Sequence, residues 1–174
     1  VPPQDYRWVT NGLLCALENI FPDWPIMVWP KLLAGLFLAM LAVLLSRMLM
    51  KWSVPILVAL MAPAIFISHP ILNEISLWNT TMPFPLWLLL SVLGFVLVDL
   101  NRPRWQRVSG FMLMVTVVLA YEIYLSCYLV LVFAEAAFRR LDGKSIDWLK
   151  IKNRLLLFFI VALFYVIQVL LTKW

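Results

Sequence analysis

Three short polar groups interrupt an otherwise strongly apolar chain, and these are the places where chemistry could occur. They comprise Asp5, Tyr6, Arg7 and Trp8; then Ser68, His69, Pro70, Asn73, Glu74, Trp78 and Asn79; and then Tyr121, Glu122 and Tyr124. A guanidinium group pairs with phosphate, and aromatic faces stack on sugars or bases. A carboxylate in a partly desolvated place can act as a general base. If the three groups converge, they suit an anionic ligand that carries a ring.

Each group also has a structural interpretation that the sequence leaves open. Asp5 and Arg7 could be solvated residues at a membrane interface. His69 could cap a short helix with Glu74 exposed, and Glu122 could make a structural hydrogen bond. Tryptophan and tyrosine at the ends of spans are typical of interfacial belts. The sequence contains no GxGxxG, Walker, HExxH or GxSxG motif, and one histidine with two widely spaced cysteines predicts no metal site.

The composition identifies the class of protein. Of 174 residues, 64% are hydrophobic and 13% are charged, whereas a soluble domain carries roughly 25% charged residues. The chain is therefore predicted to be an integral membrane protein. Its net charge of +5 is not interpreted as a nucleic-acid footprint, because the bases cluster in short loops between apolar runs.

Five apolar runs are long enough to enter a membrane. They are Pro25–Ser46, Val54–Ser68, Pro83–Leu100, Val108–Phe138 and Leu155–Leu171. Bases follow the first run (Arg47, Lys51) and the third run, and the segment Arg139–Arg154 carries six bases against two aspartates. The positive-inside rule predicts that these three basic segments are cytoplasmic. The base-free segment 69–82 then falls on the opposite side.

The fourth run poses a parity problem, because both of its flanks are cytoplasmic by charge. Its 31 residues are too few for two full spans of about 20 residues each. Two short helices that meet near Ala120–Tyr124 would solve the problem, and one long tilted helix is the alternative. At the N-terminus, residues 5–21 predict an amphipathic helix at the membrane interface.

The predicted fold is all-α. It is a polytopic transmembrane helical bundle of about six membrane segments, two of them short, with the N-terminal interfacial helix. Residues 1–174 are expected to form a single transmembrane domain. Because the chain begins at Val1, it is interpreted as a fragment of a longer protein.

The order of these features resembles the Gtr-type glucosyltransferases that decorate bacterial O-antigen, which are polytopic enzymes of the GT-C kind. Tyr6-Arg7-Trp8 stands where that family has GRW, and Tyr121-Glu122 stands where it has YQ. His69-Pro70 with Leu72-Asn73-Glu74 is similar to its NP-F-E-L loop. Tyr6, His69 and Glu122 depart from the glycine, asparagine and glutamine of the family pattern.

The resemblance implies a GT-C-like bundle in the bacterial inner membrane with its site facing the periplasm. The implied reaction moves glucose from a polyprenyl-phosphate carrier in the membrane lipid to a glycan of the O-antigen or lipopolysaccharide. Asp5 and Glu74 are the implied catalytic carboxylates. The implied binding residues are Arg7, Trp8, His69, Asn73, Trp78, Tyr121 and Glu122. A transporter or flippase component for lipid-linked sugars, or a non-catalytic membrane subunit, is the alternative; cofactors and oligomeric state stay open.

Overall fold

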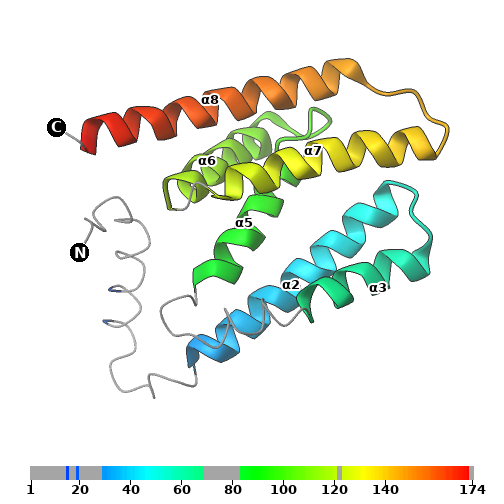
Figure 1. Cartoon of the computed structure of the whole chain (residues 1–174), viewed down its shortest axis with the longest axis horizontal. Coiled ribbons are helices and arrows are strands. Elements are labelled where there is room, and N and C mark those ends of the chain that lie inside the picture. The colour runs from blue at the N-terminus through cyan, green and yellow to red at the C-terminus, as the bar shows by residue number, and fades with distance from the viewer. Residues whose placement is uncertain (1–14, 16–18, 20–28, 69–82, 121–122, 173–174) are drawn as a thin grey trace.

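The computed structural model describes residues 15, 19, 29–68, 83–120 and 123–172. These residues form helices and contain no strand. The helices are α2 (Trp29–Lys51), α3 (Ile56–Ile67), α5 (Pro83–Leu97), α6 (Arg104–Ala120), α7 (Ile123–Leu141) and α8 (Trp148–Thr172) (Figure 1). The predicted interfacial helix at residues 5–21 lies outside the described residues, apart from Cys15 and Asn19.

Two of these helices are long and apolar enough to cross a membrane. Within α2, Leu32–Lys51 has a mean hydropathy of 2.3, and Trp148–Leu171 of α8 has one of 2.5. Large apolar side chains point outward on α3 and α8, including Leu57, Ile65, Phe159 and Leu171. So much exposed apolar surface is unfavourable in water and favourable against lipid. The structure thus agrees with the predicted helical membrane bundle.

The fourth apolar run folds as two helices rather than one. Helix α6 ends at Ala120 and α7 begins at Ile123. Arg107 near the start of α6 and Glu135 near the end of α7 both lie beside the first turns of α8. The run therefore leaves that end of the bundle and returns to it, as the sequence predicted. The alternative of one long tilted helix is wrong.

Helix α5 lies at the centre of the core. Its buried side chains include Trp87, Val92 and Phe95, and they pack with Tyr124 and Tyr128 of α7. The Phe95 and Tyr128 rings meet edge to face with centroids 5.5 Å apart. Helix α6 packs closely against α5 where Gly94 faces Gly110, because neither residue has a side chain to separate the backbones.

The three base-rich segments lie at one end of the bundle. Lys51 at the end of α2 forms an ion pair with Asp99, which follows α5, at 3.4 Å. Lys144, in the connection between α7 and α8, donates a hydrogen bond to Ser53 after α2 at 2.8 Å. The charge count predicted this common side. We call it the base-rich end.

Helix α8 begins earlier than the apolar pattern predicted. The sequence places the last run at Leu155–Leu171 and treats Arg139–Arg154 as a loop. In the structure, Arg139 belongs to α7, and Lys150 and Arg154 lie in the first turns of α8. The reason is tertiary, because both bases find carboxylate partners on other elements.

Candidate functional site

The nine residues predicted from the sequence to form the site all lie outside the described residues. They are Asp5, Arg7, Trp8, His69, Asn73, Glu74, Trp78, Tyr121 and Glu122. Their proposed convergence therefore stays a prediction. The structure does describe the starts of the two helices that follow the second and third groups, so the distance between these two starts can be given.

Those helix ends lie together. Phe84 is near the start of α5, just after residues 69–82, and Tyr124 is near the start of α7, just after residues 121–122. The Tyr124 hydroxyl donates a hydrogen bond to the Phe84 carbonyl oxygen at 2.9 Å, and the two rings lie 5.5 Å apart. Tyr124 is only 1% exposed, so packing as well as the hydrogen bond holds this contact in place. The contact lies at the opposite end of α5 and α7 from the base-rich end.

The base-rich end holds a cluster of buried charges that the sequence did not predict. Asp99, Glu135, Lys150 and Arg154 are each no more than 7% exposed. The Lys150 ammonium lies 3.0 Å from Asp99 Oδ2 and 2.7 Å from Glu135 Oε1. We call these four residues the charge cluster. They join the end of α5 to α7 and α8.

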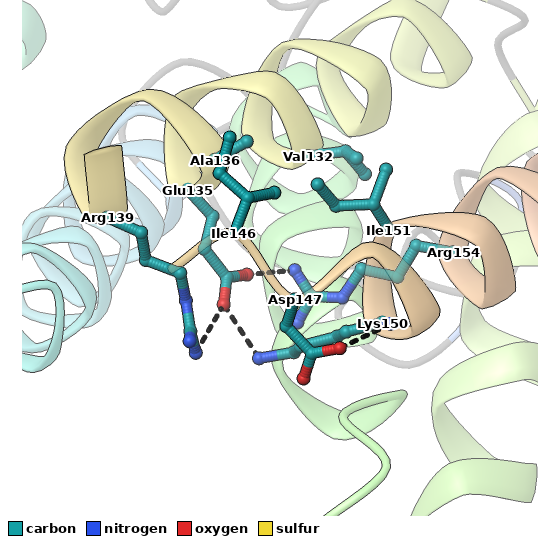
Figure 2. A pocket seen from close by; sticks show the side chains of 9 residues that line it. All are labelled: Val132, Glu135, Ala136, Arg139, Ile146, Asp147, Lys150, Ile151 and Arg154. Carbon is teal, nitrogen blue, oxygen red and sulfur yellow. Dashed lines mark hydrogen bonds and ion pairs between the residues drawn. The ribbon is translucent and has the colours of Figure 1, made fainter. Parts of the chain in front are cut away.

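The carboxylate of Glu135 is surrounded by three bases, Arg139, Lys150 and Arg154 (Figure 2). Arg154 donates from Nη1 to Glu135 Oε2, and Arg139 Nη2 lies 3.3 Å from Glu135 Oε1. The Arg154 guanidinium also stands over the Phe95 ring, 4.0 Å from its centroid. Each carboxylate therefore has more than one cationic neighbour, which offsets the unfavourable burial of its charge.

The electrostatic balance keeps Asp99 ionised. Burial by itself raises the pKa of Asp99. The hydrogen bonds from Lys150 and from the Asn101 backbone N–H, with the charges of Lys150 and Lys51, more than offset this and lower the pKa to about 2. On the nearby loop, the hydrogen bond from Lys144, followed by that from Ser53, lowers the pKa of the exposed Asp142.

The ion pairs of the charge cluster hold α7, α8 and the end of α5 together, which is a structural role. Both of its carboxylates are paired with bases. The pocket beside Glu135, Asp147 and Lys150 has a volume of only about 10 Å³, at most a single water (Figure 2), and two larger cavities of about 190 and 200 Å³ adjoin other members of the cluster. Nor do the described residues include a group of His, Cys, Asp and Glu side chains that could hold a metal ion. Because both carboxylates are paired with bases, neither is a good candidate for a general base.

A local sequence signal for this cluster existed. Glu135 lies inside the apolar stretch LVFAEAAF, where a charge is unfavourable without a partner. Lys150 and Arg154 share one helical face by their spacing of four, as do Glu135 and Arg139. Asp99, at the end of the third run, completes the set. Glu135 carries the same signal as Glu122, which the sequence predicted to be a site residue.

The comparisons with known proteins assign the chain at the level of family. No curated protein and no solved structure matches it. The model of the family described as Glucosyl transferase GtrII matches residues 7–174, which is nearly the whole chain. The match includes all the described helices and eight of the nine predicted site residues, all except Asp5. This chain belongs to the GtrII glucosyl transferase family.

Proposed function

We propose that this protein is a membrane glucosyltransferase that moves glucose from a polyprenyl-phosphate carrier to a hydroxyl group of a glycan. The proposed glycan is the O-antigen of lipopolysaccharide, and the proposed place is the periplasmic face of a bacterial inner membrane. The observation that carries the proposal is the family match over residues 7–174. A donor that is anchored in the membrane also makes a nucleotide-binding domain unnecessary.

The arrangement of the helices supports a site at the end opposite the base-rich end. Bases are enriched in cytoplasmic loops, so the base-rich end is expected to face the cytoplasm. The contact between Tyr124 and Phe84 lies at the other end, next to the chain positions of two of the three polar groups. This placement is consistent with a site that faces the periplasm.

The proposed reaction assigns a role to each group. The acceptor oxygen attacks C1 of glucose, the bond from C1 to the phosphate oxygen breaks, and the electron pair leaves with the polyprenyl phosphate. Glu74 or Asp5 takes the acceptor proton as general base, and Arg7 stabilises the departing phosphate. The remaining residues line the donor and acceptor positions: Trp8, His69, Asn73, Trp78, Tyr121 and Glu122.

Purified full-length protein in a lipid bilayer tests this proposal. Transfer of labelled glucose from polyprenyl-phosphate glucose to the lipid-linked glycan is measured for the wild type, Arg7→Ala and Glu74→Gln. Each variant is expected to lose about 100-fold or more in kcat, as the loss of an acid–base or phosphate-stabilising group does. Arg104→Ala is the matched control, because Arg104 is an exposed base at the other end of the bundle.

The possible outcomes distinguish an error in the proposed site from an error in the proposed function. Wild-type activity in both Arg7→Ala and Glu74→Gln would show that the site is wrongly assigned. Absence of glucose transfer by the wild type, with lipid-linked sugar crossing the bilayer instead, would replace the transferase with a flippase.

A further inference from the structure

A cavity at the base-rich end is lined by positively charged side chains. It has a volume of about 200 Å³ and lies where the end of α5, the start of α6 and the start of α8 come together. Its polar lining consists of Arg107, Lys150, Asn153 and Arg154, and no carboxylate takes part. One water occupies about 30 Å³ in the liquid, so the cavity has room for a group of several heavy atoms. We call it the basic cavity.

The charge around the basic cavity is not balanced by the described acids. Lys150 and Arg154 pair with Asp99 and Glu135, but these two carboxylates also face Lys51 and Arg139. Four bases therefore share two acids. Arg107 adds a further positive charge and forms no ion pair with any described residue. An anion in the cavity would reduce this excess.

Two guanidinium groups in the lining also have an N–H group that makes no hydrogen bond. Among the described residues, the Nε atoms of Arg107 and Arg154 are buried and have no hydrogen-bond partner. Arg154 is only 5% exposed. A buried donor without an acceptor costs about 1–3 kcal/mol, and native proteins rarely leave one so. Neither atom is accessible to water, so these N–H groups would reach an acceptor oxygen in the cavity only after a small rotation of the guanidinium groups.

The rest of the lining limits the kind of anion. Val98 and Leu157 give the cavity an apolar wall beside its bases. A neighbouring cavity of about 190 Å³ also contains bases, but Asp99 and Glu135 line it, so it suits an anion less well. Guanidinium groups match the oxygens of phosphate especially well. An apolar wall next to a phosphate position is typical of a lipid headgroup at the membrane surface.

We infer that the basic cavity binds a phosphate group, and that Arg107 and Arg154 are its main donors. The phosphate of an anionic membrane lipid and free inorganic phosphate present the same chemistry to these residues. This site is separate from the proposed glucosyl-transfer site, since it lies at the base-rich end. The inference of phosphate binding does not rest on the proposed transfer reaction.

Thermal unfolding of the full-length protein in maltoside micelles tests the inference. The ligands are short-chain dihexanoyl phosphatidylglycerol and inorganic phosphate, with sodium chloride at matched ionic strength as the reference. A ligand that binds only the folded state raises the Tm with its concentration. The wild type and Arg104→Gln are expected to respond alike, and Arg107→Gln is expected to bind at least tenfold more weakly.

The two ligands distinguish the source of the phosphate. A response to both ligands supports recognition of the phosphate group alone, and a response to the lipid only assigns the site to a membrane lipid. Arg107→Lys is measured beside Arg107→Gln, because it keeps the charge and a helix-compatible side chain. We expect it to bind more weakly than the wild type, since an ammonium lacks the planar fork of donors. No response in the wild type, or unchanged affinity in both Arg107 variants, would overturn the inference.

Discussion

At the scale of single residues, the carboxylates of Asp99 and Glu135 carry the charge cluster. Each is buried, and each is surrounded by bases from other elements. A buried pair of this kind contributes little when compared with apolar packing, but the removal of one partner leaves an uncompensated charge. Substitution of one partner is therefore the informative test.

Asp99→Asn is expected to destabilise the protein by about 3 kcal/mol, because it removes the negative charge that faces Lys150 and Lys51. The measurement is thermal unfolding in detergent micelles. Asp142→Asn is the matched control, since Asp142 pairs with Lys144 at an exposed position and should contribute almost nothing. Equal effects of the two substitutions would mean that burial does not set the energy of the charge cluster.

The same aspartate predicts a dependence on pH. The pKa of Asp99 is about 2 in the folded protein and about 4 in an unfolded chain. Folding lowers the pKa of Asp99. The ionised Asp99 therefore stabilises the folded protein fully at a pH above its pKa in the unfolded chain, and this stabilisation is lost as the pH falls through its pKa in the folded protein. The wild type should lose on the order of 2 kcal/mol between about pH 5 and pH 2 through this group.

Asp99→Asn should lack this part of the acid dependence. Unfolding midpoints measured over the same pH range for both proteins provide the comparison. Parallel pH profiles for the wild type and Asp99→Asn would contradict the assignment of the low pKa to Asp99.

At the scale of elements, the contact between α5 and α6 depends on two glycines. A Cβ added at Gly110 would lie 2.8 Å from the Leu97 Cβ and 3.0 Å from the Gly94 carbonyl oxygen. A Cβ at Gly94 would lie 2.8 Å from Met114 Cγ, which belongs to a flexible side chain, and 3.2 Å from the Gly110 carbonyl oxygen. The helices must separate to accept a side chain at Gly110, whereas Met114 can move.

Gly110→Ala is therefore expected to destabilise the protein by about 1–3 kcal/mol, as overpacking does. Gly94→Ala should have a smaller effect. Gly35→Ala is the control, because a Cβ at Gly35 meets nothing within 4 Å and alanine favours a helix over glycine. Thermal unfolding of the three variants checks this order. A more stable Gly110→Ala than Gly35→Ala would contradict the close packing of α5 and α6.

The elements were largely predictable from the sequence, and their exceptions have physical reasons. The first, second, third and fifth apolar runs predicted α2, α3, α5 and α8, and the charge parity predicted the break between α6 and α7. The start of α8 was not predictable from its own residues. Lys150 and Arg154 look like loop bases until Asp99 and Glu135, distant in sequence, are known to neutralise them.

At the scale of the whole molecule, the arrangement separates two ends of different chemistry. One end gathers the bases and the charge cluster, and the other holds the Tyr124–Phe84 contact. The sequence predicted this separation from loop charges alone. It could not give the pairing of the charges or the basic cavity, because these depend on which helices pack together. The nine predicted site residues stay a prediction from the family pattern.

The orientation of the protein in the membrane can be checked with single cysteines in a background that carries Cys15→Ser and Cys127→Ser. Lys144→Cys, at the base-rich end, should react with a membrane-impermeant thiol reagent only in inverted vesicles, because Lys144 is exposed and belongs to a basic loop. Glu122→Cys should react from the periplasmic side. Labelling of Lys144→Cys from outside intact cells would reverse the proposed orientation.

The most direct test of the account is glucose transfer in membrane vesicles of known orientation, with full-length protein and polyprenyl-phosphate glucose in the bilayer. The acceptor is a soluble glycan that cannot cross the membrane. If the protein is a glucosyltransferase with its site opposite the base-rich end, labelled glucose should reach this acceptor in right-side-out vesicles and should not do so in sealed inverted vesicles. Transfer in inverted vesicles alone, or transfer in neither preparation, would contradict the account.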